Sequence, residues 1–395
     1  MVDYTGTSGD DDYSGTTGDD RIFGLGGDDN LWGNDGHDII RAGGGRDIVS
    51  DSAGADLLDG GNGLDTLVIS YLSFFDTQPP ITFTFDPDAG PVTTRFGGTA
   101  INFEQINFTG GSSDDDITGG AHDDLLRGWF GNDVLHGGAG DDFLIGDSGD
   151  DQEFGGDGDD LVTGNGGSDY LVGGNGDDTL IGGRPGDTVQ GHDILEGGRG
   201  ADHFMGGLGQ TDISFIHASS GVDVDFVQGI GTRGEAAGDT YGDGGGFFPL
   251  HGQVLGSDFG DTIIGYNEQF GRGGNDTLIA GTTTRLMTGG DGRDTFGFRF
   301  DYHVINDGVT IADFDQSLHE KIDLSAIDTK PQAAGDQKFH FLGTDDFIND
   351  KPGQVRYQVI GEQTFITMTL DGRSGADATI VLDGVYTLTA HDFIL

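Results

Sequence analysis

An apolar residue or a Tyr recurs every nine positions along much of the chain. The first run of these positions is Tyr13, Ile22, Leu31, Ile40, Val49, Leu58 and Leu67, and a second includes Ile117, Leu126, Leu135, Leu144, Val162, Leu171 and Leu180. Successive side chains of a strand point to opposite faces, so only the central residue of a three-residue strand points inward. The pattern predicts many very short strands, each adding one side chain to a core.

Glycine and aspartate keep the same nine-residue spacing between the predicted strands. Seven units follow one another without a frame slip from Gly6 to Val68, beginning GTSGDDDYS and GTTGDDRIF. Each unit has Gly at the fourth place and Asp at the sixth, while the first place is Ala42 in the fifth unit and Asp51 in the sixth. Such a repeat in register indicates one structural unit copied along a stack.

The nine-residue repeat occurs in two further runs. The second opens at Gly110, is interrupted by extra residues after Gly182 and resumes with GGRGADHFM at Gly197. A weaker third run contains GSDFGDTII at Gly256, followed by GRGGNDTLI and GGDGRDTFG. The three runs together hold 20 sixth-place aspartates.

The glycines and aspartates of one unit suit a tight turn that binds calcium. Glycine adopts positive φ without the steric cost that a β-carbon brings. The turn would direct backbone carbonyls and a carboxylate inward, and these hard oxygens are the ligands that Ca²⁺ takes, six to eight at a time. The predicted ligands are the sixth-place residues Asp11, Asp20, Asp29, Asp38, Asp47, Asp56, Asp65, Asp115, Asp124, Asp133, Asp142, Asp151, Asp160, Asp169, Asp178, Asp193, Asp202, Asp261, Asp276 and Asp294.

Two units are expected to make one coil, so residues 18 apart should stack. In the first run the predicted columns are Asp11, Asp29, Asp47 and Asp65 on one edge and Asp20, Asp38 and Asp56 on the other. In the second run they are Asp124, Asp142, Asp160 and Asp178 on one edge and Asp115, Asp133, Asp151 and Asp169 on the other. Glu153 occupies an apolar position near Asp151, so a bulge that turns Phe154 inward instead is expected there.

Stacked carboxylates predict that folding depends on calcium. Strands lie about 4.8 Å apart, and two unit charges at that spacing repel by about 3 to 4 kcal/mol at an effective dielectric near 20. One buried apolar side chain contributes only about 1.5 to 3 kcal/mol, and backbone entropy opposes folding as well. Cations between the turns would reverse the balance, so the calcium-free chain is expected to be disordered.

The unit G-G-x-G-x-D-x-U-x resembles the calcium-binding nonapeptide of RTX proteins. Near the C-terminus, IADFDQSLHEKIDLSAID, FHFLG, VRYQV and LTAHDFIL resemble the terminal domain of serralysin-type secreted proteins. The resemblance implies an all-β fold: a parallel β-roll interrupted by two inserts and closed by a β-rich domain. It also implies that the last residues, about Thr387 to Leu395, are an uncleaved signal for a type I secretion apparatus.

The predicted organisation has six segments. They are a first RTX block at 1–68, a β-rich insert at 69–109, a second block at 110–211, an insert at 212–255, a third block at 256–297 and a C-terminal β domain at 298–395. The inserts alternate like strands, and the first is expected to form a hairpin or an extra sheet edge. Their aromatics either cap the interrupted roll or form a ligand-binding face: Tyr71, Phe74, Phe75, Phe247 and Phe248.

The amino-acid composition limits which partners the protein can bind and in which compartment it acts. Asp and Glu number 69 against 18 Lys and Arg, for a formal charge of -51, which argues against binding to nucleic acid or an anionic membrane. The acids are periodic rather than massed, so a solvating disordered tail is the weaker interpretation. The chain has no Cys, no apolar stretch long enough to span a membrane and no secretory signal at Met1-Val2-Asp3-Tyr4. Weak calcium sites fill where calcium is millimolar, which indicates a secreted, extracellular or cell-surface protein.

Neither the zinc-protease motif nor the lipase motif occurs in the sequence. The His319-Glu320 pair lacks the second His of H-E-x-x-H, because Asp323 stands in its place, and no serine fits G-x-S-x-G. His192 and His203, with His217 and His251, are the best candidates for a polar site. An enzyme acting on extracellular polysaccharide could draw on the inserts; its candidate residues are Arg95, His217, Arg233, Tyr241 and His251.

Three alternative functions are compatible with these sequence features. The first is a secreted, non-catalytic calcium-binding protein that folds on extracellular Ca²⁺ and acts in adhesion, surface coating or contact with a matrix or host. The second is the polysaccharide-acting lyase or glycosidase. The third, a fragment or paralogue of a larger toxin, is disfavoured because no pore-forming or Lys-acylated segment precedes the repeats.

Overall fold

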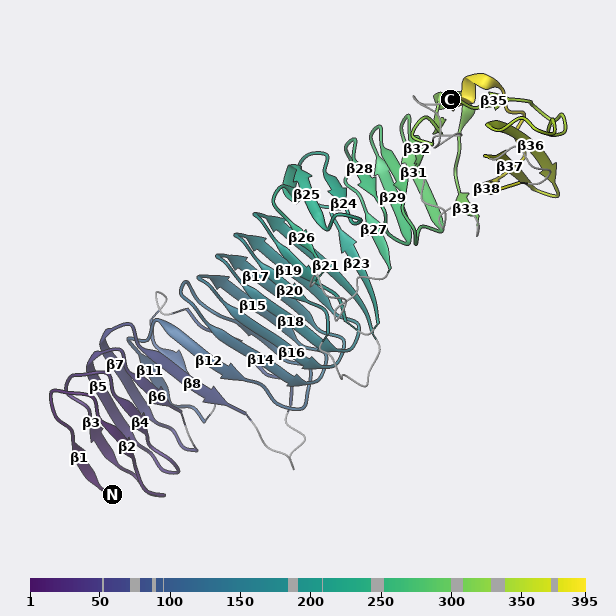
Figure 1. Cartoon of the computed structure of the whole chain (residues 1–395). Coiled ribbons are helices and arrows are strands. Elements are labelled where there is room, and N and C mark those ends of the chain that lie inside the picture. The colour runs from purple at the N-terminus through teal and green to yellow at the C-terminus, as the bar shows by residue number, and fades with distance from the viewer. Residues whose placement is uncertain are drawn as a thin grey trace. The chain divides into compact units, whose positions relative to one another are not determined.

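The computed structural model describes residues 1–51, 53–71, 79–86, 90–94, 96–183, 191–207, 209–242, 252–299, 308–327, 338–370 and 376–395. It forms two compact units, Met1–Gly209 and Gln210–Leu395. Both are built from strands, as Figure 1 shows, and the helical segments among the described residues are short 3₁₀ turns: η2 (Gly234–Ala236), η3 (Gln316–Leu318) and η4 (Ala390–Asp392). The expected all-β class is confirmed.

The first unit is a coil whose strands stack in parallel, with neighbouring strands of the chain on alternate faces. One face contains β2 (Asp12–Ser14), β4 (Asn30–Trp32), β6 (Ile48–Ser50), β8 (Thr66–Ser70), β12 (Gln105–Thr109), β14 (Leu125–Phe130), β16 (Phe143–Ser148), β18 (Leu161–Gly166), β20 (Thr179–Ile181) and β22 (His203–Met205).

The other face has two stacks. The first contains β1 (Asp3–Thr5), β3 (Arg21–Phe23), β5 (Ile39–Gly45), β7 (Leu57–Gly63) and β11 (Thr99–Ile101). The second contains β9 (Thr82–Thr84), β13 (Asp116–Thr118), β15 (Val134–Ala139), β17 (Gln152–Asp157), β19 (Tyr170–Asn175) and β21 (His192–Arg199). This parallel stacking is the β-roll that the repeat predicts.

The register puts the predicted apolar residues in the core. Leu126, Leu144 and Val162 pair in line across β14, β16 and β18, and each is fully buried. The one predicted inward residue of the first run that is partly exposed is Tyr13, whose ring stacks on Tyr4 with centroids 3.7 Å apart. An apolar residue at every ninth place therefore builds a continuous ladder.

The first insert continues the coil. Within it β10 (Val92–Thr93) pairs antiparallel with β11, which is the expected hairpin contact, while β11 also stacks on β7. Strand β12 pairs with β8 through Ile106 and Leu67, and with β14 through Phe108 and Leu126. This shift of two residues keeps the same side chains inward, because strand side chains alternate with a period of two.

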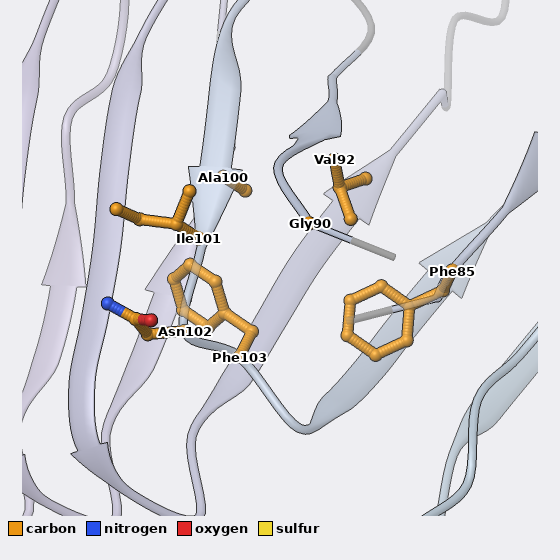
Figure 2. Close-up of a pocket in the computed structure, with 7 residues that line it drawn as sticks. All are labelled: Phe85, Gly90, Val92, Ala100, Ile101, Asn102 and Phe103. Carbon is orange, nitrogen blue, oxygen red and sulfur yellow. The ribbon is translucent and has the colours of Figure 1, made fainter. Parts of the chain in front are cut away.

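A small hollow lies in this insert. Figure 2 shows the residues that line it: Phe85, Gly90, Val92, Ala100, Ile101, Asn102 and Phe103. None of them is titratable, and the Asn102 amide donates to the Asp59 carboxylate. The hollow therefore offers an apolar surface rather than acid or base groups. Among the insert aromatics that were expected to cap the roll or to form a ligand-binding face, Tyr71 is buried, whereas Phe74, Phe75, Phe247 and Phe248 lie outside the described residues.

The second unit repeats the architecture. One face stacks β23 (Gln210–Ser214), β27 (Gln253–Leu255), β29 (Glu268–Gly273), β31 (Leu286–Asp291) and β33 (Val309–Ile311). The other stacks β24 (Asp223–Asp225), β28 (Thr262–Ile264), β30 (Thr277–Ala280), β32 (Thr295–Phe298), β34 (Lys321–Asp323) and β39 (Phe393–Ile394). The short strands β25 (Ile230–Arg233) and β26 (Thr240–Tyr241) extend β24 in an antiparallel manner.

The chain beyond 297 begins as more roll and ends as an antiparallel sheet. Strands β33 and β34 are still parallel rungs, although the sequence pattern places the end of the third block before them. Next to β33 come β38 (Ala378–Asp383), β37 (Gln363–Thr369), β36 (Gln354–Ile360) and β35 (His340–Phe341). The final strand β39 returns to pair with β34.

The expected bulge at Glu153 is wrong. Strand β17 pairs in unbroken register with both neighbours, Glu153 lying between Leu135 and Leu171. The Glu153 side chain is fully buried, while Phe154 is on the outer face, where its ring stacks on His136 with centroids 4.8 Å apart. Backbone pairing on both sides of β17 holds the register, since a slip of one residue would turn every side chain of the strand over.

Candidate calcium sites

The sixth-place aspartates form the predicted columns, and a hydrogen-bond chain connects the members of each column. The backbone N–H of one Asp donates to Oδ1 of the Asp one coil further, as from Asp124 to Asp142 at 2.7 Å and from Asp142 to Asp160 at 2.8 Å. The same contact joins Asp29 to Asp47 at 2.9 Å. Where the interruption after Gly182 lengthens a coil, Asp178 still donates to Asp202 at 3.0 Å. The extra residues are thus accommodated without breaking the column.

The second carboxylate oxygen of the inner aspartates has no donor. Within the described part of the chain, Oδ2 is buried and accepts no hydrogen bond in Asp29, Asp38, Asp47, Asp65, Asp133, Asp142, Asp151, Asp160, Asp169, Asp178, Asp276 and Asp294. Buried polar atoms of native proteins are nearly always partnered. A repeated set of buried, unpartnered anionic oxygens is therefore evidence of a cation.

The first-place glycine shows where that cation fits. A β-carbon on Gly137 would lie 2.3 Å from Asp142 Oδ2 and 2.6 Å from the carbonyl oxygen of Gly155, one coil further. Gly271 repeats this geometry, with Asp276 Oδ2 at 2.2 Å and the Gly289 carbonyl at 2.6 Å. Only glycine leaves this space open. A carboxylate and a carbonyl of the next coil converge there, and both are ligands of the hard kind that Ca²⁺ prefers.

Backbone carbonyls must supply most of the remaining ligands. Among the residues that the structure describes, no three Asp, Glu or His side chains gather at one point where a metal could bind. A site with one carboxylate and several neutral oxygens carries little charge, and calcium affinity falls with the number of charged ligands. The arrangement thus fits weak sites that need abundant calcium.

Burial raises the pKa of several inner aspartates. It raises the pKa of Asp142 to about 8, against an opposing hydrogen bond from the Asp124 N–H and with the help of the neighbouring charges of Asp124 and Asp160. Burial likewise raises the pKa of Asp38 to about 6. A proton and a cation would therefore compete for the same buried oxygens.

The first coils differ from the inner ones. In the second unit of the repeat, the Thr16 N–H donates to Asp20 Oδ2 at 2.6 Å, and the Thr16 hydroxyl donates to the same atom at 2.8 Å. This N–H lowers the pKa of Asp20. Asp11 and Asp261 show the same contact, from Thr7 and Ser257. At the start of the second run, the N–H groups of Gly111 and Gly120 donate to Oδ2 of Asp115 and Asp124 in the same way. The first carboxylates of a run therefore have a backbone donor of their own.

Two glutamates extend the columns beyond the nonapeptides, and the sequence pattern did not reveal them. Glu104, in the first insert, accepts the Asp65 N–H at 2.9 Å in the way that a further Asp would. Glu320 precedes β34 as Asp294 precedes β32, and its Oε1 is buried without a donor among the described residues. The one available signal was a carboxylate two residues before an inward-facing Ile, at Ile106 and Ile322.

The third block has aspartates on one edge only. Asp261 donates to Asp276 and Asp276 to Asp294, each at 2.8 Å. On the opposite edge, the residues two places before Gln269 and Met287 are Asn267 and Arg285. The twenty predicted ligands therefore include no residue of that edge.

The candidate residues for a polar site, as far as the structure describes them, do not come together in one place. His192 begins β21 and His203 begins β22, which belong to different faces of the coil. Arg233 donates to Asp223 at 2.8 Å and to the Gly260 carbonyl at 2.7 Å, Tyr241 is buried and donates to Asp239 at 3.0 Å, and His217 is exposed. Arg95 and His251 lie outside the described residues.

Comparison with known proteins agrees with this geometry. The family model of the RTX calcium-binding nonapeptide repeat (4 copies) matches residues 5–40, 32–67, 107–135, 130–153, 154–189 and 190–213. Residues 5–213 thus carry RTX calcium-binding nonapeptide repeats. The chain is accordingly a calcium-binding RTX repeat protein, and its carboxylate ladders fit several Ca²⁺ ions. A search of the curated proteins found no match.

The RTX match ends at 213, before the third block. That block nevertheless shows the same hydrogen-bond chain and the same glycine cradle, as at Gly271. Among the described residues, none of the helices has the length and apolar character that crossing a membrane requires.

Proposed function

We propose that this protein is secreted and folds around Ca²⁺ ions when it reaches an extracellular medium rich in calcium. The observation that carries the proposal is the repeated Oδ2 atom, buried and without a donor among the described residues, beside an open glycine. The proposed ligands are the sixth-place aspartates whose Oδ2 has no donor among the described residues, from Asp29 in the first run to Asp294 in the third, with backbone carbonyls between coils. Asp11 and Asp20 are not among them, because the Thr7 and Thr16 N–H groups donate to their Oδ2 atoms. Bound calcium would supply the positive charge that holds neighbouring carboxylates together.

The C-terminal tail supports export of an unfolded chain. Its last strand, β39, pairs with β34, Phe393 is buried, and Asp392 caps η4 through a capping box with Thr389. A secretion signal in this segment would therefore be held in a fixed conformation in the folded protein, with Leu388, Asp392 and Phe393 buried. A type I apparatus would reach it in a chain that is still unfolded for lack of calcium, and external calcium would then drive folding.

The proposed role is non-catalytic: adhesion, surface coating or contact with a matrix or host. The serralysin-like identity of the C-terminal domain is part of the same proposal and rests on the resemblance of its sequence. The polysaccharide-acting enzyme draws no support from Arg233 and Tyr241, because both are already engaged within the fold.

Circular dichroism and calcium titration test the central claim. The purified chain in chelator is expected to lack β signal and to gain it in millimolar Ca²⁺, but not in the same concentration of Mg²⁺, which demands a smaller, more rigid octahedral shell. A chain that is fully folded in chelator at low salt, or that binds no calcium, contradicts the proposal.

A further inference from the structure

Glu153 is a carboxylate in the ladder of apolar side chains. It stands in the column of Leu135, Leu171 and Leu195, all fully buried, and it is fully buried itself. Neither Oε1 nor Oε2 has a hydrogen-bond partner among the described residues. A nonpolar residue would suit this position far better, so the carboxylate needs a reason.

The Glu153 side chain extends to the edge of the core where the fifth unit of the second run makes its turn. A β-carbon on Gly146, the first residue of that unit, would lie 2.3 Å from Glu153 Oε1 and 2.4 Å from Asp151 Oδ2. Both oxygens are unpartnered within the described residues. The corresponding cradles at Gly128 and Gly164 each have the Oδ2 of their own aspartate nearest, at 2.1 and 2.4 Å, and no second carboxylate oxygen among their closest atoms.

Among the residues that the structure describes, no basic side chain explains the burial of Glu153. The charges that act on it most strongly come from the same edge of the coil, and all are carboxylates: Asp169, Asp151, Asp193 and Asp133. The residues directly above and below it in the ladder are leucines. A bound cation would satisfy both oxygens and offset this concentration of negative charge.

We infer that Glu153 is a direct ligand of a calcium ion held in the turn from Gly146 to Asp151. This inference rests on the proposed function and adds to it a site of a different composition. Two carboxylates instead of one would face this ion, and affinity rises with the number of charged ligands. The site lies on β17, with complete neighbouring coils in β15 and β19. It therefore fills at lower calcium concentration than the one-carboxylate sites beside it.

The test uses the full-length chain and three variants. Glu153→Leu restores the apolar residue of the repeat, and Glu153→Gln keeps the shape but removes the charge. Glu196→Gln is the matched control, because Glu196 is a buried glutamate of β21 in the same compact unit, Met1–Gly209. Calcium binding is measured by competition with a chromophoric chelator, stability in calcium by denaturant unfolding, and residual β structure in chelator at pH 5 by circular dichroism. Asp151→Asn marks the loss of the neighbouring ligand.

The Glu153 substitutions are expected to be unfavourable in calcium but not in chelator. In calcium, E153L and E153Q lose the tightest binding step or weaken it by about tenfold or more, as D151N does, while E196Q does not. In chelator at pH 5, E153L shows at least as much β signal as the wild type, because an unpartnered buried carboxyl group has been replaced by an apolar one. Lack of calcium binding by the wild type would overturn the proposed function. Binding by the wild type with an unchanged tightest step in both Glu153 variants would overturn this inference alone.

Discussion

At the scale of the residue, the two oxygens of one aspartate have separate tasks. In Asp142, Oδ1 accepts the N–H of Asp124 and ties two coils together, while Oδ2 is buried beside Gly137. In Asp20 a hydrogen bond from Thr16 occupies Oδ2. The same residue type at the same place of the repeat is thus poised for a cation in one coil and partnered by the chain in another.

Replacing these two aspartates by asparagine should therefore have different effects on the number of bound calcium ions. Asp142→Asn keeps an acceptor for the Asp124 N–H but removes the anionic oxygen, so we expect one fewer bound ion and lower stability in calcium. In chelator the same change should increase the residual β signal, because repulsion from Asp124 and Asp160 is relieved. Asp20→Asn should leave the ion count unchanged. Calcium stoichiometry and denaturant midpoints check both, and equal ion loss in the two variants would contradict the distinction.

Filling a glycine cradle should mimic the loss of an ion. In Gly137→Ala the new methyl group would lie 2.3 Å from Asp142 Oδ2 and 2.6 Å from the Gly155 carbonyl, so the turn must open. We expect a lower ion count and a destabilisation of about 1 to 3 kcal/mol in calcium, as for other overpacked sites. Gly18→Ala is the control, since no atom lies within 4 Å of its β-carbon. Thermal and denaturant unfolding of both variants decide the matter, and similar losses would show that space is not the cause.

At the scale of the element, burial raises the pKa of several aspartates that stack within one column, such as Asp133 and Asp169. Burial raises the pKa of Asp133, Asp169 and Asp178 to about 8, and that of Asp65 to about 6. A pKa above the ordinary value of 3.8 means that the folded chain binds the proton more tightly than the unfolded chain. The resulting stabilisation is fully present below pH 3.8 and is lost as pH rises through 6 to 8.

The calcium-free chain should therefore gain β structure on acidification. We expect circular dichroism in chelator to show more β signal at pH 5 than at pH 8, because protons then neutralise the columns that calcium neutralises otherwise. In calcium the trend should be the reverse, with the calcium concentration at the folding midpoint rising as pH falls. A calcium-free chain whose β content is the same at both pH values would contradict the assignment of the columns.

The nine-residue pattern predicted the elements that repeat and failed where the repeat is broken. Core residues such as Leu126 and columns such as Asp124 and Asp142 follow from periodicity alone, since the stack forces residues 18 apart into register. Strand β12 was less predictable, because its two-residue shift depends on pairing with two different neighbours. Glu104 comes directly before this strand and lies outside the nine-residue spacing, so the repeat did not predict its contact with Asp65.

Glu153 shows a second limit of pattern reading. A charged residue at an apolar place favours a bulge, because burial of an unpaired carboxylate costs several kcal/mol. The structure instead keeps the register, and the carboxylate extends to the turn of Gly146. Backbone pairing with β15 and β19 dominates over the preference of one side chain, and only the three-dimensional arrangement shows what the side chain contacts.

At the scale of the whole molecule, folding and export are proposed to exclude each other. Inside a cell, scarce calcium would leave the net charge of -51 uncompensated, and the tail would be accessible. Outside, calcium would close the coils, and the tail would pack as η4 and β39. Each coil depends on its neighbours, as in other repeat proteins, so a folded coil would favour folding of the next one.

Removal of the tail should therefore keep the protein inside the producing cell. In a cell with a type I apparatus, deletion of residues 387–395 is expected to leave an intact chain in the cytoplasm, whereas deletion of an equal number of residues at 3–11 is expected to leave export unchanged. A fusion of residues 298–395 to a passenger should be secreted. Immunoblots of cells and medium measure the partition and show that each chain is full length. The deletion also removes β39, so its calcium midpoint should rise, which a refolding assay on protein purified from the cells checks separately. Normal export of the chain that lacks 387–395 would refute the assignment of the signal, whatever its refolding shows, because export precedes folding in this scheme.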